Sequence, residues 1–382
     1  MSDIILFFTF IRPFISSLAF PYANFIFSAF LFMLLLAWLL RNSKTLRLTK
    51  YLALPLSVFI LSIAISLILS QDKSISIGES YKYATGILLF LVGASFSCKY
   101  RNRAIFWLVA SGLIISLLSI YQYILGFQHL TSYIAEQNIS SSFILDYIAQ
   151  KRTFFPFVTP NALGGYLAMV LPLTLTIGPL IWLAIPLSMA LFLTKSLGAL
   201  ISLLGGLLIF FYMRGGIKKR RLFVLLAVLT IIISIFITRS AIEKKQFTPT
   251  FSALTRWDYW METIKIIEKH PLNGVGIGNF NLPSSRYTHN SYLQILAETG
   301  ILGLASFLWL VISVLRRGFK KIKDSGDKQL AGLLSLCCIF LFHNAVDFSF
   351  FLPEINTIWW LALGILSSYL SADQPDKLIS FS

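Results

Sequence analysis

The chain has 382 residues, of which 57% are hydrophobic and only 13% are charged, and its mean hydropathy is +0.77. Soluble domains carry about twice this share of charged residues, so the composition excludes a soluble globular protein and predicts an all-α polytopic membrane protein. The net charge of +16 comes from basic residues in short loops between apolar runs, which indicates membrane orientation or an anionic substrate and argues against nucleic-acid binding.

Twelve apolar runs follow one another along the chain and predict about twelve transmembrane helices in a single integral membrane domain, residues 1–382. The runs on either side of Gly178-Pro179 are short and could form one broken element. The first run is interrupted by Arg12-Pro13 and lacks a small-residue cleavage site, so we do not expect a cleavable signal peptide. The runs cover residues 4–20, 22–40, 51–69, 83–97, 104–125, 160–177, 179–193, 197–213, 222–238, 299–315, 329–345 and 355–370.

Lys and Arg are concentrated in alternate loops, and this pattern predicts the orientation of the helices. The strongly basic loops 41–50, 99–103, 214–221 and 316–328 fall on the same side when twelve spans are counted. By the positive-inside rule this side is the cytoplasm, and both termini lie there as well. Two long loops, 126–159 and 239–298, are then expected on the opposite face.

The second long loop, 239–298, holds most of the outward-facing cations, including Arg256 and Arg286. Outward positive charge opposes the usual bias, so we expect an anionic partner there, and phosphate is the natural candidate. Within the loop, apolar residues repeat at helical spacing with charged residues between them, up to Pro271. This pattern predicts an amphipathic helix in the membrane interface, formed around Trp257, Trp260, Met261, Ile264 and Ile267.

After that helix, Gly274-Val275-Gly276-Ile277-Gly278 resembles a phosphate-binding loop only superficially. It has no preceding strand and no following βα unit, so we interpret it as a flexible turn.

The pair His289-Asn290 stands at the mouth of the tenth apolar run. A lone histidine there is usually an interfacial residue, but an imidazole that is neutral at periplasmic pH also suits a general base. The neighbours favour catalysis: Asn290 could cap the helix or hold the imidazole tautomer, Glu298 follows on the same segment, and Arg256 and Arg286 share the loop. A metal site is not predicted, because the four histidines are scattered and no carboxylates stand at ligand spacing.

Other polar residues stand at the outward ends of other runs. Arg152 and Asn161 flank the start of the sixth run, Lys195 lies between the seventh and eighth, and His343 and Asp347 end the eleventh. Each has an ordinary explanation as a loop cation, a helix cap or a side chain that snorkels to the interface. For His343 and Asp347, capping and substrate contact remain equally open.

Several segments between about 150 and 370 carry recognisable motifs: Thr159-Pro160-Asn161 with Leu163-Gly164-Gly165-Tyr166-Leu167, Arg256-Trp257-Asp258-Tyr259-Trp260, His270-Pro271-Leu272 with Gly274 to Phe280, His289-Asn290 through Glu298 and Gly300, and finally His343 and Asp347. In this order they resemble the O-antigen ligase and O-antigen polymerase superfamily of bacterial inner (cytoplasmic) membranes. The resemblance implies a GT-C-like fold and an inverting, metal-independent glycosyltransferase that needs no cofactor. Its donor would be a glycan on undecaprenyl diphosphate, used on the periplasmic face.

The resemblance also implies roles for particular residues. His289 would deprotonate the acceptor hydroxyl, and Arg256 would bind the diphosphate. The family usually has Ser-Arg-Gly where this chain reads Lys195-Ser196-Leu197-Gly198, so we expect Lys195 to supply that charge, as a point charge and not a bidentate fork. Two groups complete the predicted site: the cations Arg152 and Arg286, and the supporting residues Asn290, Glu298, His343, Asp347 and Asn161.

The acceptor and the class of protein leave alternatives open. Lipid A-core as acceptor would make the protein an O-antigen ligase of lipopolysaccharide biosynthesis, which we favour because one outward loop dominates a compact chain. A second lipid-linked repeat would make it an O-antigen or exopolysaccharide polymerase, and protein hydroxyls are a third possibility. A twelve-helix transporter is the rival class, but it predicts repeat halves, broken central helices and charges near mid-membrane. Membrane lipids are expected partners in every case.

Overall fold

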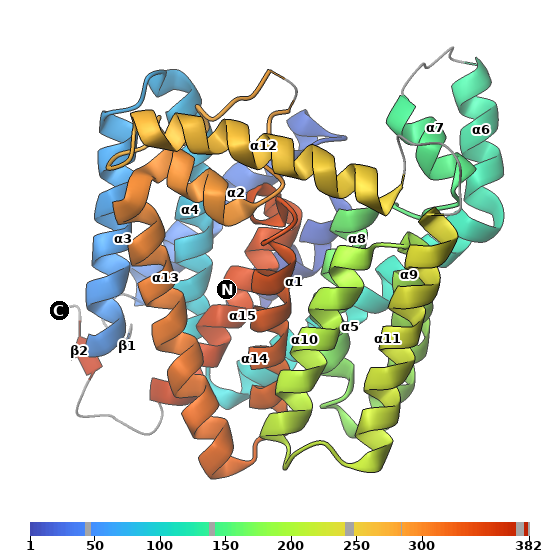
Figure 1. The fold of residues 1–382 in the computed structure, drawn as a ribbon. Coiled ribbons are helices and arrows are strands. Elements are labelled where there is room, and N and C mark those ends of the chain that lie inside the picture. The colour runs from blue at the N-terminus through green and yellow to red at the C-terminus, as the bar shows by residue number, and fades with distance from the viewer. Residues whose placement is uncertain (43–46, 137–141, 241–247, 284, 372–377, 381–382) are drawn as a thin grey trace.

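The computed structural model describes residues 1–42, 47–136, 142–240, 248–283, 285–371 and 378–380. Helices make up nearly all of the described chain, and two short strands, β1 (Arg47–Thr49) and β2 (Leu378–Ser380), pair antiparallel with Arg47 opposite Ser380 (Figure 1). The helices are α1 Ser2–Ile11, α2 Pro21–Asn42, α3 Lys50–Ile68, α4 Lys73–Ala94, α5 Cys98–Tyr121, α6 Phe127–Glu136, α7 Ser142–Ala149, α8 Pro160–Thr174, α9 Ala184–Thr194, α10 Leu197–Met213, α11 Lys219–Ser240, α12 Pro249–Lys269, α13 Ser291–Ser325, α14 Lys328–His343 and α15 Pro353–Ser371. Short turns of other helix types are η1 Arg12–Phe14, η3 Gln122–Gly126, η4 Gly178–Leu183 and η6 Ser349–Phe351.

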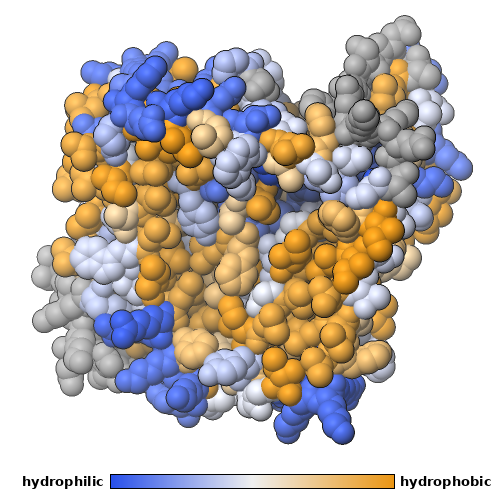
Figure 2. All heavy atoms as spheres, viewed as in Figure 1, coloured by the Kyte–Doolittle hydropathy of each residue, from blue (hydrophilic) through white to orange (hydrophobic). Residues whose placement is uncertain are grey.

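The bundle has two polar ends and a hydrophobic middle zone. The described parts of the four basic loops meet at one end, and α12 lies across the other end (Figure 1). Figure 2 shows hydrophobic residues over the zone between these ends. An all-helical membrane protein is therefore confirmed. Among the described residues, five helical stretches are long and apolar enough to cross a membrane: Pro21–Asn42, Tyr51–Ile68, Cys98–Ile134, Lys219–Ser240 and Ser291–Ser325. The count of twelve spans and the GT-C fold therefore stay predictions.

The first predicted span does not form one helix. α1 ends at Ile11, because Pro13 cannot continue the hydrogen-bond ladder, and the chain turns through η1 before α2 begins. A helix of 10 residues is about 15 Å long, half the thickness of the hydrocarbon core. Arg12 is buried at the end of α1, where it donates to Asn24 and lies 3.8 Å from the carboxylate of Glu354.

The first long loop is more helical than the sequence indicated. The helix that begins at Cys98 continues through η3 into α6, and α7 follows within the predicted loop 126–159. In Figure 1, α6 and α7 form a lobe beside α12 at the same end of the bundle. Residues 137–141 of this loop lie outside the described residues.

The centre of the bundle is formed by α8, α14 and α15, whose side chains are almost all buried. α15 packs along α4 at very short range, because Gly93 and Gly364 face the backbone of the partner helix where a Cβ would overlap carbonyl oxygens. Trp359 and Trp360 have no exposed surface and fill the space beside this contact. The ends of α8 and α14 are therefore held in fixed positions next to the α12 end of the bundle.

α13 is two helices joined at a kink. Gly300 has φ +66°, and a Cβ there would overlap the carbonyl of Leu272, so only glycine fits. The kink leaves the carbonyls of Ala297 and Glu298 without their helical donors. The N–H groups of Val275 and Gly276 donate to them instead, at 2.9 and 3.0 Å. The glycine-rich segment 274–278, interpreted from the sequence as a flexible turn, therefore braces the kink by backbone hydrogen bonds.

The predicted amphipathic helix is α12, which starts at a Thr248 cap and ends just before Pro271. It packs against α13 and α11 and lies across the bundle end. Arg256, Tyr259 and Thr263 lie on its covered side. An apolar stripe lies on its exposed side: Phe251, Leu254, Trp257, Met261 and Ile264.

Candidate active site

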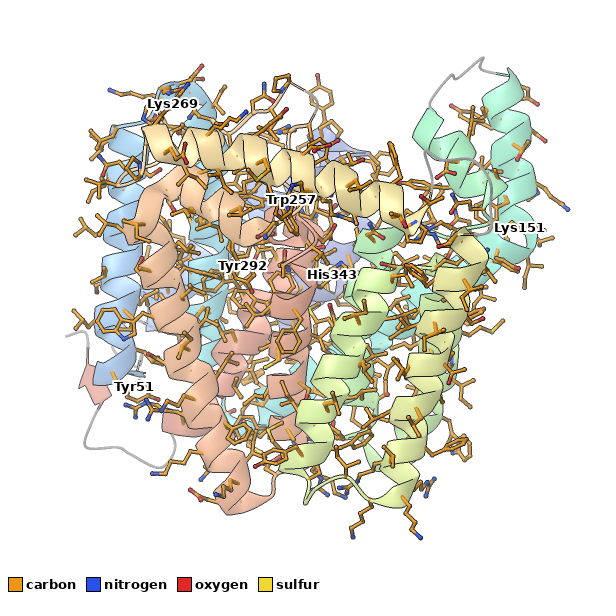
Figure 3. All side chains as sticks on the ribbon, viewed as in Figure 1. Tyr51, Lys151, Trp257, Lys269, Tyr292 and His343 are labelled. Atoms are coloured by element: carbon orange, nitrogen blue, oxygen red, sulfur yellow. The ribbon has the colours of Figure 1, made fainter. Side chains whose placement is uncertain are left out.

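A cavity of about 120 Å³ lies beneath the N-terminal part of α12. Figure 2 shows hydrophilic atoms in a recess between α12 and the hydrophobic flank of the bundle, and in Figure 3 His343 lies beneath α12. Three arginines face the cavity and none of the described residues that line it is acidic, so the described lining concentrates positive charge. The lining residues are Arg152, Asn161, Leu197, Gly198, Arg239, Pro249, Ser252, Arg256, His343 and Val346.

Arg152 is buried in the wall of the cavity. Its Nε donates to the carbonyl of Thr194 at 3.0 Å, and its Nη2 donates to Asn161 Oδ1 at 3.2 Å. Burial, and then the charge of Arg239, lower the pKa of Arg152 to about 9. The guanidinium still carries its charge at neutral pH, but in surroundings that favour an added anion.

The other two arginines come from the ends of α11 and α12. Arg239 is buried and donates from Nη1 to the carbonyl of Lys195 at 3.2 Å. Arg256 donates to Ser252 Oγ at 2.9 Å, and its Nε has no partner among the described residues. Burial lowers the pKa of Arg256, although the negative charge of Asp347 opposes this. A phosphate group could satisfy the unused guanidinium N–H groups as a bidentate partner.

His343 and Asp347 form a buried pair at the end of α14. His343 Nε2 lies 3.1 Å from Asp347 Oδ2 and 3.2 Å from the carbonyl of Asn161. Both are acceptors, so we assign the proton to Nε2. The other ring nitrogen, Nδ1, has no hydrogen-bond partner among the described residues. Gly165 leaves room for this ring, because a Cβ there would overlap it.

Asp347 supplies the carboxylate that acts on the charge of Arg256. Burial would raise its pKa, but the charge and hydrogen bond of His343, with a hydrogen bond from Ser349, lower the pKa to about 2. Asp347 is therefore ionised at any physiological pH.

His289 is held by rings from two elements. It stacks on Tyr259 of α12 with centroids 5.8 Å apart, and it meets Phe348 edge to face at 4.8 Å. Its φ is +53°, the left-handed region that few residues other than glycine adopt. Burial lowers its pKa to about 4, with Asp347 opposing and Arg256 adding to the effect. The imidazole is therefore neutral near pH 7 and lies within electrostatic range of both charged groups.

Residues 182–308 match the family model described as O-antigen ligase. This segment is similar to the O-antigen ligase family. The match confirms the superfamily that the motifs predicted, and it includes Arg239, Arg256 and His289. A comparison with curated proteins gave no match to this chain.

The matched segment does not contain the whole cavity. Arg152 and Asn161 precede the matched segment, and His343 and Asp347 follow it. The centre of the bundle brings them to the matched segment, because α8 and α14 pack together and against α10.

Two predicted site residues lie apart from the arginine cavity. Arg286 is exposed and pairs with Glu79 at 2.8 Å. Glu298 is buried and accepts from Gln294 Nε2 at 3.0 Å. Neither lines the cavity, because the chain reverses direction after α12 and runs back along α4 and α13. A shared loop in the sequence therefore did not mean a shared site for Arg256 and Arg286.

The structure places Arg239 in the wall of the cavity, whereas Lys195, which was predicted from the sequence to belong to the site, is not in that wall. Lys195 has φ +50° and donates from Nζ to the carbonyl of Gln150 at 2.7 Å, so it does not line the cavity. Arg239, noted in the sequence only as one of several outward cations, does line it. The signal that could have found it is its position at the end of the apolar run 222–238 that the loop charges predict to face outward, where the positive-inside rule disfavours a cation.

Asn290 caps α13, the first of its two predicted roles. Its Oδ1 accepts from the backbone of Tyr292 at 3.1 Å and of Leu293 at 3.2 Å.

In the part of the chain that the structure describes, no group of three or more His, Cys, Asp or Glu side chains could hold a metal ion.

Proposed function

We propose that this protein transfers a glycan from a polyprenyl diphosphate to an acceptor hydroxyl at the periplasmic face of the inner membrane. The observation that carries the proposal is the juxtaposition of three arginines around one cavity with a neutral imidazole and an ionised carboxylate beside it. Arginines bind a diphosphate, an imidazole accepts a proton, and a carboxylate stabilises the imidazolium that results.

The donor diphosphate would bind in the arginine cavity. When the bond between the anomeric carbon and the diphosphate oxygen breaks, negative charge accumulates on that oxygen. Arg152, Arg239 and Arg256 are already in place, so they stabilise this charge without reorganisation. Removal of one such donor from a comparable anion site costs about 3–4 kcal/mol in the transition state.

His289 would act as the general base. It takes the proton of the acceptor hydroxyl as that oxygen bonds to the anomeric carbon from the face opposite the diphosphate, so the anomeric configuration inverts. Its pKa of about 4 makes it a weak base. A bound diphosphate would offset the positive charge of Arg256 and raise the pKa of His289, so the base becomes stronger when the donor is present.

Asp347 and His343 would support this step. The negative charge of Asp347 favours the imidazolium form of His289. The hydrogen bond between His343 and Asp347 fixes the carboxylate, and His343 itself forms part of the cavity wall.

We propose lipid A-core as the acceptor, which makes the protein an O-antigen ligase. The test uses the purified full-length protein with lipid-linked glycan and each candidate acceptor, in the presence of a chelator. Transfer to lipid A-core is the expected result. Extension of the lipid-linked glycan alone would make the protein a polymerase, and transfer to protein hydroxyls would change the acceptor class. Accumulation of the substrate in proteoliposomes without any covalent change would make the protein a transporter.

A further inference from the structure

A second pair of cavities lies away from the arginine cavity, between α4, the segment 275–287 and the start of α13. The inner cavity is small, about 10 Å³, and admits little more than a hydroxyl-sized group. The outer groove is open and about 560 Å³. The two share Glu79, Gly278, Phe280 and Arg286 in their walls, so the groove leads into the inner cavity.

Several polar side chains line the inner cavity. Tyr83 is 3% exposed, and its hydroxyl has no hydrogen-bond partner among the described residues. Glu298 and Gln294 line the same cavity and bond to each other at 3.0 Å. A buried hydroxyl without a partner is unfavourable, and a bound ligand with a hydroxyl group would remove this penalty.

The charges around the groove nearly cancel. Glu79 pairs with Lys82 and, at 2.8 Å, with Arg286. These three groups carry one net positive charge, which the carboxyl group of Glu298 offsets when ionised. The groove therefore differs from the arginine cavity, where none of the described lining residues is acidic. It does not suit a phosphate, but it offers donors and acceptors to a neutral ligand with several hydroxyl groups.

Aromatic rings complete the groove and connect it to the base. Tyr287 lines the inner cavity and stacks on Phe348 with centroids 4.3 Å apart. Phe348 in turn meets His289 edge to face. One aromatic side chain thus separates the second site from the proposed base, so a glycan whose reacting hydroxyl lies at His289 could place a neighbouring sugar in the groove.

We infer that this groove binds an uncharged sugar residue of the acceptor glycan, with one of its hydroxyl groups at Tyr83, Gln294 and Glu298. The inference rests on the proposed function, since it names where the acceptor is held. The donor glycan offers the same chemistry, so the experiments compare the two substrates.

The first experiment measures occupancy without activity. A Cβ at Gly78, in the groove wall, would meet no atom within 4 Å, so Gly78→Cys introduces a thiol without a clash. The background is Cys98→Ser, because Cys98 is exposed whereas Cys337 and Cys338 are buried. Purified lipid A-core at ten times its Kd should slow modification by a maleimide about tenfold, because only the unoccupied fraction reacts. The control is Gly178→Cys, at another site with open space, where lipid A-core should have no effect.

The second experiment uses Tyr83→Phe in the full-length protein. Loss of a hydroxyl without a protein partner should leave the thermal unfolding temperature unchanged, so misfolding does not confuse the result. The KM for lipid A-core should rise about five- to tenfold, the effect of one lost hydrogen bond of about 1 kcal/mol, while the KM for the lipid-linked donor stays the same.

The outcomes separate the groove from the proposed function. Protection of the introduced thiol by lipid A-core in a protein that transfers no glycan would support the groove and reject the reaction. Glycan transfer without protection and without a change of KM in Tyr83→Phe would overturn the groove. Protection by the lipid-linked donor alone, with an increase only in the donor KM, would overturn its assignment to the acceptor.

Discussion

His289 depends on aromatic neighbours for its position. Tyr259 and Phe348 hold the ring from α12 and from the segment after α14, and Nδ1 has no hydrogen-bond partner among the described residues. Packing therefore holds the imidazole without engaging Nδ1 in a hydrogen bond, at the cost of burial that disfavours its charged form.

We expect His289→Ala to abolish glycan transfer, with a loss of at least about 10²-fold, because general base catalysis contributes about 10²–10⁴-fold. Transfer is measured with the purified protein and lipid-linked donor, and folding is checked by thermal unfolding and gel filtration. Turnover near that of the wild type in a folded protein would remove His289 from the mechanism.

The pH dependence of transfer should reveal how the donor changes the base. The active imidazole is neutral, so the rate falls as the pH decreases through the pKa of His289. For kcat/KM, which reports the free protein, this fall should occur near the pKa of about 4. For kcat it should occur at higher pH, because the bound diphosphate raises the pKa. Equal values for both parameters would contradict a diphosphate bound beside His289.

The same shift affects stability. Since the folded pKa of about 4 lies below the ordinary value of 6.5, the unfolded chain binds more protons in this interval. The contribution of His289 to stability is therefore complete above about pH 6.5 and is lost as the pH falls to 4.

The arginines should not tolerate replacement by lysine, because a point charge cannot form two parallel hydrogen bonds to a phosphate. We expect Arg256→Lys, and equally Arg239→Lys, to lose about 10²-fold in kcat/KM for the donor. The matched control is Lys265→Ala, which removes a cation from the exposed side of the same helix and should leave transfer unchanged. A mild effect of Arg256→Lys would argue against bidentate diphosphate binding.

Among the elements, the junction of α8, α10 and α14 determines the position of His343. Gly165 of α8 lies against one side of its ring, and Gly198 of α10 lies near Nδ1 in the cavity wall. The glycines of the Leu163-Gly164-Gly165 motif therefore serve close packing. The motif acts on the site through geometry and contributes no polar group of its own there.

We expect Gly165→Ala to impair transfer although it removes no polar group. The added methyl group would overlap the His343 ring and displace it from Asp347 and Asn161. Overpacking costs about 1–3 kcal/mol of stability, so the protein should remain folded at moderate temperature. Gly178→Ala, which fills open space, is the control for expression and thermal unfolding. Full transfer activity in Gly165→Ala would show that the position of His343 is unimportant.

The kink in α13 and the segment 274–278 are one structural unit. Neither is complete alone: the kink leaves carbonyls without donors, and the segment supplies those donors. The unit also positions the second groove, because Gly278 has φ +74° and a Cβ there would press on the side chain of Glu79. If the helix from Ser291 onward were regular, the segment 274–278 would not be held in place as part of the groove wall.

At the scale of the whole molecule, the basic loops and the arginine cavity lie at opposite ends of the bundle. The strongly basic loops occupy one end of the bundle, and the arginine cavity and the second groove lie at the end crossed by α12. If the basic loops face the cytoplasm, both sites open toward the periplasm, where lipid-linked glycans meet their acceptors in the proposed reaction.

Topology can be tested with introduced thiols in the Cys98→Ser background. Lys265→Cys places a thiol on the exposed side of α12, and Arg220→Cys places one at the basic end. An impermeant maleimide should label the first in intact spheroplasts and the second only after permeabilisation, because the positive-inside rule puts the basic end in the cytoplasm. The reverse pattern would place the arginine cavity in the cytosol and end the proposed function.

The sequence alone was enough for the class of the protein, the helical segments, the amphipathic α12 and the superfamily. Hydropathy, charge bias and helical spacing are properties of neighbouring residues, so they can be read locally. The pattern was less accurate where a helix continues or breaks without a change of hydropathy. The sequence pattern therefore did not predict that α1 is too short to span the membrane or that α5 continues into α6.

The membership of each site, in contrast, depended on the folded chain. Arg239 joins Arg256 while Arg286 does not, and His343 meets Asn161 across 182 positions of sequence. The physical reason is that such contacts arise from the packing of α8, α10 and α14 and from the kink at Gly300. These determine which end of which helix faces which cavity, and no local pattern of residues carries that information.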